Sequence, residues 1–262
     1  MRLKQLVKFA TVVAGGCGTL MYAAKSSKLN ATLGSNSNTA YAASKELSNK
    51  WDSDWDKRDG ENGKASRNII LIRHGQYNLA GNDDHERCLT ELGKEQAIRT
   101  GMRLKELGLN KKITHFVVST MTRAQETGDL IYKQLGNDAI PVENTDLIRE
   151  GAPVEPDPPI DTWNPERKTF FVDGARIETG FRSFIHRANP EQEFDSTEVI
   201  VCHGNVIRYF VCRALQLPPE AWLRLSLRHC SITWLSIRPN GRVSVKCLGD
   251  SGHLPHDKLT FE

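Results

Sequence analysis

Two apolar runs far apart in the chain each lead into a histidine that is followed by glycine. Residues 69–72 precede Arg73 and His74, and residues 199–202 precede His203. Both runs are rich in β-branched residues and lack polar alternation, which predicts strands buried on both faces. In open α/β sheets, the carboxyl ends of such strands border the ligand crevice. We therefore expect both histidines at one site, where the glycines let a ligand approach the backbone.

The rest of the chain alternates between strand-like and helix-like patterns. The pattern predicts strands over 68–73, 114–119, 140–147, 198–202, 231–237 and 243–248, and helices over 90–107, 121–135, 174–188 and 205–215. A proline-rich loop covers 152–165. This alternation predicts an α/β fold with three layers, α/β/α, around a mostly parallel sheet. The sheet should be mixed, because the last two strands form a hairpin around Pro239-Asn240-Gly241.

Two further polar residues stand near a predicted strand end or helix start. Arg123 lies in the first turn of the helix over 121–135, and Glu150 precedes a glycine. Phosphoryl transfer needs a nucleophile, cationic donors for the phosphoryl oxygens and an acid for the leaving oxygen. A neutral imidazole can be the nucleophile because its ordinary pKa is about 6.5. Taken singly, each histidine could be a hydrogen-bonded strand-end residue, and Glu150 could form a surface ion pair with Arg149.

Longer stretches of the chain match a known family. They are Arg-Glu-Gly-Ala-Pro-Val-Glu-Pro-Asp-Pro-Pro (149–159), Asp-Gly-Ala-Arg-Ile-Glu (173–178), Cys-His-Gly-Asn-Val-Ile-Arg-Tyr (202–209), Trp-Leu-Arg-Leu-Ser-Leu (222–227) and Ile-Arg-Pro-Asn-Gly-Arg-Val (237–243). Together with Arg73-His74-Gly75, they resemble the histidine phosphatase (phosphoglycerate mutase-like) superfamily. The resemblance is closer to its membrane-anchored mitochondrial serine/threonine-protein phosphatases, and it extends from roughly Ser66 to the C-terminus.

The resemblance implies a role for each candidate residue. His74 matches the nucleophile, which forms a transient phosphohistidine, and Glu150 matches the general acid that later activates water. Arg73, Arg123 and His203 match the catalytic residues that bind the phosphoryl oxygens. The resemblance also implies that the enzyme hydrolyses phosphoserine and phosphothreonine in protein substrates, without a metal or other cofactor.

Two alternatives remain open. The first is a small-molecule phosphatase or mutase of the same superfamily. Against it, Ala80 stands where those enzymes carry asparagine, and only 53 positions separate Glu150 from His203, which predicts a short lid and an open pocket. The second is a non-catalytic mitochondrial membrane scaffold. The complete set of catalytic residues argues against the scaffold, because a relaxed site would be expected to lose members.

The six cysteines indicate neither a metal site nor a disulfide framework. None of them forms a Cys-x-x-Cys pair, and no cysteine–histidine group has zinc-ligand spacing. We therefore expect six reduced thiols and no bound metal. Cys202 is not expected to be a nucleophile, because it lies inside a strand and no Cys-x₅-Arg phosphate loop follows it.

The N-terminal part of the chain differs from the rest in charge. Residues 1–45 carry +6 and no acidic residue, which leaves −3 for the remainder and argues against a nucleic-acid partner. Residues 9–24 are uncharged between Lys8 and Lys25, but they are short for a membrane span, which needs about 20 residues. A cleaved secretory signal is the competing interpretation. Basic flanks without acids favour a mitochondrial signal-anchor, and the resemblance implies the same, with the outer membrane favoured.

These features predict three parts: a membrane anchor over 1–25, a linker over 26–66 and a catalytic domain over 67–262. The linker contains Trp-Asp-Ser-Asp-Trp-Asp at 51–56, and its two tryptophans would share one face of a helix. They could pack locally against the domain. The resemblance instead implies self-assembly and activation through a Trp-Asp-x-Asn-Trp-Asp segment, here Trp51, Asp52, Trp55 and Asp56. Asp54 replaces the asparagine of that segment.

Overall fold

The computed structural model describes residues 50–58 and 63–261. The chain divides into two compact units, Met1–Trp51 and Asp52–Glu262, and the second contains the expected catalytic domain. The expected anchor over 1–25 lies outside the described residues, as does most of the expected linker. Within the described ranges, no helix is both long and apolar enough to cross a membrane.

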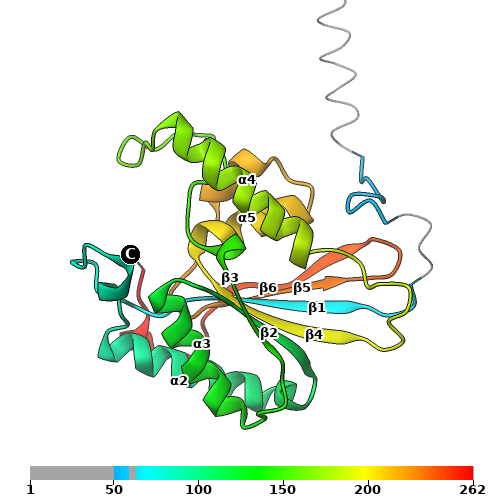
Figure 1. The fold of residues 1–262 in the computed structure, drawn as a ribbon, viewed down its shortest axis with the longest axis horizontal. Coiled ribbons are helices and arrows are strands. Elements are labelled where there is room, and N and C mark those ends of the chain that lie inside the picture. The colour runs from blue at the N-terminus through cyan, green and yellow to red at the C-terminus, as the bar shows by residue number, and fades with distance from the viewer. Residues whose placement is uncertain (1–49, 59–62, 262) are drawn as a thin grey trace, which may run out of the picture. The chain divides into compact units, whose positions relative to one another are not determined.

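The second unit is built around one six-stranded sheet in the order β3-β2-β4-β1-β5-β6 (Figure 1). Its strands are β1 (Arg67–Arg73), β2 (Ile113–Ser119), β3 (Val142–Thr145), β4 (Ser196–Cys202), β5 (Ile232–Ile237) and β6 (Val243–Asp250). The first four strands pair in parallel, whereas β5 is antiparallel to both β1 and β6. The predicted mixed sheet and its terminal hairpin are therefore confirmed.

Helices cover both faces of the sheet (Figure 1). One face carries α2 (Glu91–Glu106) and α3 (Thr122–Leu135), and the other carries α4 (Arg167–Phe184) and α5 (Gly204–Ala214). Side chains of β1 alternate between the layers: Ile70 and Ile72 pack in the core with α2 and α3, whereas Ile69 and Leu71 pack in the core with α4 and α5. This alternation explains why the run is apolar throughout, and it confirms the three-layer α/β/α class.

Short 3₁₀ helices occur in the connections and were not predicted. They are η1 (Asp84–Glu86), η2 (Leu109–Lys111), η3 (Asp146–Ile148), η4 (Pro219–Arg224) and η5 (His256–Lys258). Helices of three to six residues are too short to show a hydrophobic period, so the sequence pattern gave no indication of them.

The boundaries predicted for the third helix were wrong at both ends. The prediction was 174–188, but α4 spans Arg167–Phe184. The first turns were missed because Phe171 and Val172 are exposed, which hides the usual inward-facing apolar period. The helix ends early because Ile185 takes an extended conformation, while its N–H still donates to the carbonyl of Phe181.

Candidate active site

The sheet brings the two His-Gly pairs together. Arg73 at the end of β1 lies opposite Cys202 at the end of β4, so His74 and His203 follow neighbouring strand ends. The backbone N–H of His74 donates to the carbonyl of Cys202 (3.0 Å), and the two imidazole centroids are 5.1 Å apart. The expectation that both histidines lie at one site holds in the structure.

A packing constraint acts on the glycine that follows His74. A Cβ at Gly75 would lie 2.6 Å from the carbonyl oxygen of Gly93 in α2. Glycine at this position therefore allows the turn after β1 to pack on the helix. The close approach of a ligand to this glycine stays a prediction.

Hydrogen bonds fix His74 in one neutral tautomer. Its Nδ1 lies 2.8 Å from the carbonyl oxygen of Gly75, which can only accept, so Nδ1 carries the proton. Its Nε2 is 3.2 Å from Nε of Arg123, which can only donate, so Nε2 presents a lone pair. Burial lowers the pKa of His74 well below its ordinary value, and the neighbouring imidazole of His203 and the charges of Arg123 and Arg73 lower it further. The imidazole is therefore available as a nucleophile through Nε2.

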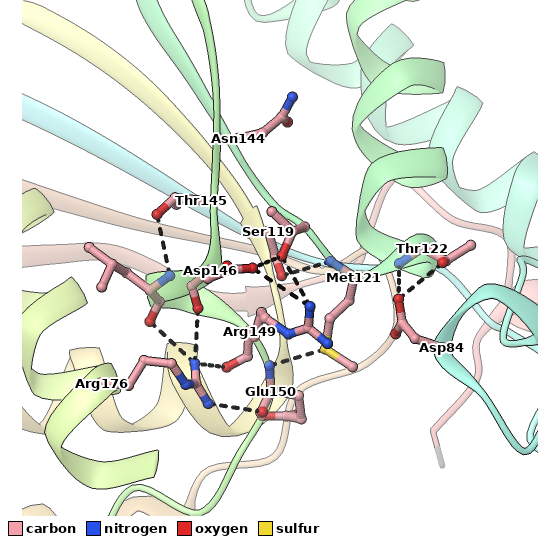
Figure 2. Close-up of polar contacts among 12 residues, drawn as sticks. Asp84, Ser119, Met121, Thr122, Asn144, Thr145, Asp146, Arg149, Glu150 and Arg176 are labelled. Carbon is pink, nitrogen blue, oxygen red and sulfur yellow. Dashed lines mark hydrogen bonds and ion pairs between the residues drawn. The ribbon is translucent and has the colours of Figure 1, made fainter. Parts of the chain in front are cut away.

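Arg123 lies in the first turn of α3, as predicted from the sequence. Its guanidinium lies over the ring of Tyr77, 4.7 Å from the centroid, and its Nη1 is 3.7 Å from Oδ1 of Asp84. Asp84 in turn accepts hydrogen bonds from the backbone and hydroxyl of Thr122 (Figure 2). Arg123 is thus held beside the nucleophile, at a helix N-terminus that favours anions.

Arg73 is directed by two acceptors that follow the last turn of η4. Its Nη1 donates to the carbonyl of Leu227 (2.8 Å), and its Nη2 donates to Nε2 of His229 (3.2 Å). Because Nε2 of His229 accepts, Nδ1 of that ring carries the proton and donates to Oγ1 of Thr260 (2.8 Å). Burial, with the charges of Arg73 and Arg123, lowers the pKa of His229 to about 3, so this third imidazole is neutral.

His203 caps the N-terminus of α5 and is fully buried. The hydroxyl of Ser119 lies 2.8 Å from Nε2 of His203 and accepts from the N–H of Met121 (3.4 Å). We infer that Ser119 donates to Nε2, which leaves the proton of His203 on Nδ1. Among the described residues, that buried Nδ1 has no hydrogen-bond partner. It can therefore donate to an oxygen of a bound phosphoryl group.

Glu150 lies on the loop between η3 and α4 (Figure 2). Its carboxylate accepts from the N–H of Gly151 (3.1 Å) and from the N–H of Asn205 (3.4 Å). Burial raises the pKa of Glu150, against the opposing effects of these hydrogen bonds and of Arg123. The alternative of a surface ion pair with Arg149 is not observed, because Arg149 lies 3.6 Å from Asp146 instead.

Three residues of the site were not identified from the sequence: Tyr77, Asp84 and His229. Tyr77 and Asp84 come from the irregular segment between β1 and α2, where no periodic pattern indicates which side chains point inward. His229 could have been found, because it stands just before β5. An antiparallel β5 begins beside the carboxyl end of β1, as the pairing of Ile72 with Ile232 shows.

The described part of the Trp-Asp segment packs on its own domain. Residues 53–56 form turns rather than a helix. Trp55 is 9% exposed, its Nε1 donates to the carbonyl of Gly241 (2.8 Å), and its ring lies 6.0 Å from that of Phe181. Arg187 donates to both carboxylate oxygens of Asp56, and it also donates to Asp54 (3.2 Å). The backbone of Asp52 pairs with the side chain of Gln216, whereas Trp51 is 41% exposed.

The described cysteines form no disulfide bond. Cys88, Cys202, Cys212, Cys230 and Cys247 are free thiols, and burial raises the pKa of Cys202 far above its ordinary value. In the described ranges, no group of three or more histidine, cysteine, aspartate or glutamate side chains could hold a metal ion. Cys17 lies outside those ranges.

The fold and this arrangement of histidines agree with a sequence comparison. The profile of the histidine phosphatase superfamily (branch 1) matches residues 69–154 and 159–250, and the chain belongs to that superfamily. A protein from Homo sapiens named serine/threonine-protein phosphatase PGAM5, mitochondrial, is 56% identical over 204 residues, 78% of this chain and 69% of the relative. The protein of that name from Rattus norvegicus is 52% identical over 234 residues, 80% of each chain.

A solved structure gives the same picture of the fold. The crystal structure of a phosphoglycerate mutase from Plasmodium falciparum is 32% identical, with a TM-score of 0.52. The match covers 76% of this chain and 100% of that chain. The three-layer architecture is therefore shared with an enzyme named for a small phosphorylated substrate.

Proposed function

We propose that this protein is a membrane-anchored mitochondrial phosphatase that hydrolyses phosphoserine and phosphothreonine in proteins, through a phosphohistidine at His74. The proposal rests chiefly on the buried, neutral imidazole of His74, whose Nε2 lone pair lies 3.2 Å from the guanidinium of Arg123. A nucleophile beside cationic donors, with a buried carboxyl group in the same site, is the set of groups that transfer of a phosphoryl group requires.

In the first step, Nε2 of His74 attacks phosphorus, and the bond from phosphorus to the serine or threonine oxygen breaks. Arg123, Arg73 and Nδ1–H of His203 donate hydrogen bonds to the phosphoryl oxygens, on which negative charge is spread. The proton of Glu150 passes to the leaving oxygen. The raised pKa of Glu150 keeps that proton available at a higher pH than an exposed glutamate would.

In the second step, water attacks the phosphohistidine. Glu150, now a carboxylate, accepts a proton from the water, and the bond between phosphorus and Nε2 breaks. Inorganic phosphate leaves, and His74 returns to the neutral tautomer that donates to the carbonyl of Gly75. Both steps use the same carboxyl group in opposite directions.

The substrate class is supported by the names of the relatives and by the short connection between Glu150 and His203. The test is the hydrolysis of phosphoserine and phosphothreonine peptides by the full chain in detergent micelles, beside bisphosphoglycerate. We expect a higher kcat/KM for the peptides. A clear preference for bisphosphoglycerate would favour the small-molecule alternative. That substrate is the relevant comparison because the fold resembles that of the Plasmodium falciparum phosphoglycerate mutase. No turnover of either substrate would favour the non-catalytic scaffold.

The proposed location is a mitochondrial membrane, with the outer membrane favoured and a single N-terminal anchor over 1–25. It is supported by the uncharged stretch 9–24 between lysines and by the mitochondrial names of the relatives. Deleting residues 1–25 should release an active enzyme from membranes under carbonate extraction. Deleting residues 26–45 is the matched control and should leave the protein in the membrane fraction. Release by both deletions, or by neither, would contradict the anchor.

The proposal includes self-association through the segment 51–56. Trp51 is the exposed tryptophan of the pair, whereas Trp55 is buried against its own domain. We therefore expect Trp51→Ala to lower the oligomer mass without a loss of thermal stability. Trp55→Ala should lower both, because truncating a buried tryptophan costs about 3–5 kcal/mol. Light scattering over a wide range of concentrations measures the mass. An unchanged mass in both variants would leave the segment as an intrachain contact.

A further inference from the structure

The stretch Asp-Gly-Ala-Arg-Ile-Glu at 173–178 takes no part in the mechanism above, although it is among the stretches that carry the family resemblance. It lies within α4, and its Arg176 extends to the loop that holds Glu150 (Figure 2). Nη1 of Arg176 donates to the carbonyls of Arg149 (2.6 Å), Asp146 (3.2 Å) and Leu147 (3.4 Å), and Nη2 donates to the carbonyl of Glu150 (3.1 Å). One guanidinium therefore holds four carbonyl groups of a single turn.

Asp173, one helical turn earlier, holds the other side of Glu150. Its Oδ2 accepts from the N–H of Ala152 (3.0 Å), and its Oδ1 accepts from Nη2 of Arg176 (3.1 Å). The loop also lies close to the helix backbone, because a Cβ at Gly174 would meet the carbonyl oxygen of Pro153 at 2.5 Å. The peptides on both sides of Glu150 are thus tied to the same turn of α4.

This support matters because the carboxylate of Glu150 has little support of its own. Its two hydrogen bonds, to the N–H groups of Gly151 and Asn205, are 3.1 Å and 3.4 Å long. One of these donors belongs to the loop itself, so the position of the acid depends on the position of the loop. A general acid acts only within hydrogen-bond reach of the leaving oxygen, and an error of about 1 Å can cost roughly a hundredfold in rate.

We propose that Arg176, together with Asp173, is a positioning residue that sets the reach of Glu150 toward the leaving-group oxygen. The inference rests on the proposed function, in which Glu150 is the acid. It distinguishes Arg176 from a residue that merely stabilises the fold, because a misplaced acid impairs only reactions that need protonation of the leaving group. Alkoxide from phosphoserine needs that proton, whereas 4-nitrophenolate leaves readily without it.

The experiment compares kcat/KM of the full-length protein in detergent micelles on a phosphoserine peptide and on 4-nitrophenyl phosphate. This parameter reports the transfer to His74 and is independent of later hydrolysis of the phosphohistidine. We expect Arg176→Gln to lower kcat/KM by about 10- to 100-fold on the peptide and by less than about threefold on the aryl ester. Glu150→Gln should show the same pattern, more strongly. Arg176→Lys, which keeps the charge and fewer donors, should fall between.

A double variant tests whether Arg176 acts through Glu150. If it does, Glu150→Gln/Arg176→Gln should be no slower on the peptide than Glu150→Gln alone, because the acid to be positioned is absent. The matched control is Arg182→Gln, which removes another arginine of α4, one that pairs with Glu178 (3.0 Å) away from the loop of Glu150. This control should leave kcat/KM on both substrates unchanged.

Different results would overturn the role of Arg176 and the role of Glu150. Equal losses on both substrates in Arg176→Gln and Arg176→Lys, or no loss in either, would overturn the positioning role while the phosphatase assignment stands. Additive losses in the double variant would also overturn it. If Glu150→Gln itself shows no dependence on the leaving group, the assignment of Glu150 as the acid fails, and the role of Arg176 falls with it.

Discussion

In the proposed mechanism the site has a phosphate-binding side and a leaving-group side, and the two are built in different ways. His74, Arg73 and His203 follow the ends of β1 and β4, and Arg123 stands in the first turn of α3. The first three are placed by the register of β1 against β4, and Arg123 by the start of the helix that follows β2. Glu150 stands on an irregular loop after η3, and that loop is held by side chains of α4.

The difference indicates how each side responds to change. The groups proposed to surround phosphorus are buried and stand on strand ends and helix starts, so they should serve every phosphoryl donor alike. The acid depends on contacts between a loop and one helix, so its contribution should vary with the leaving group and with those contacts.

The largest effect is expected from removal of the nucleophile. His74→Ala should lower kcat by at least about a thousandfold on a phosphoserine peptide and on 4-nitrophenyl phosphate alike, because both use the same nucleophile. The domain should remain folded, which circular dichroism checks. A variant that kept most of its activity on either substrate would contradict the assignment of His74 as the nucleophile.

The proposed role of Glu150 as the acid should be visible in the pH dependence of kcat/KM. In wild type, kcat/KM on a phosphoserine peptide should fall as pH rises through the pKa of Glu150, which burial places above its ordinary value of 4.5. Glu150→Gln should lower kcat/KM by about 10²- to 10⁴-fold and remove that fall. The ratio of the two pH profiles on the same peptide cancels the titration of the substrate itself. A fall that persists unchanged in Glu150→Gln would assign it to another group.

A smaller effect on phosphate binding is expected from His229, which directs Arg73 and was not identified from the sequence. His229→Ala removes the acceptor that directs Nη2 of Arg73. Hydrogen bonds to charged groups contribute about 1.5–3 kcal/mol, so the inhibition constant of inorganic phosphate should rise by about tenfold or more. Thr260→Val, which removes the hydroxyl that accepts from Nδ1 of His229 and from Nε2 of Gln96, should have a weaker effect in the same direction. Unchanged phosphate affinity in both variants would show that the placement of Arg73 does not depend on His229.

The smallest effect is expected on the free energy of unfolding and its dependence on pH. The pKa of His229 is about 3 in the folded protein, against about 6.5 when unfolded, so the unfolded chain binds the proton first. The neutral ring therefore stabilises the fold fully above pH about 6.5, and this contribution is lost as pH falls, by about 1.4 kcal/mol per pH unit. Urea unfolding measures the free energy of unfolding of wild type and of His229→Asn. The difference between these two free energies should shrink by roughly 2 kcal/mol from pH 6.5 to 5. A constant difference would mean that His229 is solvated and easily protonated.

Much of the fold and of the phosphate-binding side could be predicted from the sequence. Residues 69–72 and 199–202 lie in strands with a helix layer on each face, and burial on both faces leaves a plain apolar run in the sequence. The residue after such a run lies at the carboxyl edge of the sheet. For this reason the sequence alone predicts that His74 and His203 lie at one site.

The remainder could not be predicted because it depends on contacts between irregular segments. Tyr77 and Asp84 reach Arg123 from a loop without a period, and Arg176 reaches Glu150 from a helix whose start is hidden by exposed apolar residues. The packing of Trp55 against Phe181 likewise joins segments far apart in the chain. Local pattern cannot choose between that intrachain contact and an intermolecular one.

The most direct test of the account is to trap and locate the phosphorylated residue. Wild type is mixed with a phosphoserine peptide, quenched in alkali and examined by ³¹P NMR and by peptide mapping. Because Nδ1 of His74 donates to the carbonyl of Gly75 and Nε2 faces Arg123, the account predicts an acid-labile phosphohistidine on Nε2 of His74. The same label should be absent from His74→Ala. A phosphoryl group on another residue, or turnover of His74→Ala at the wild-type rate, would contradict the account.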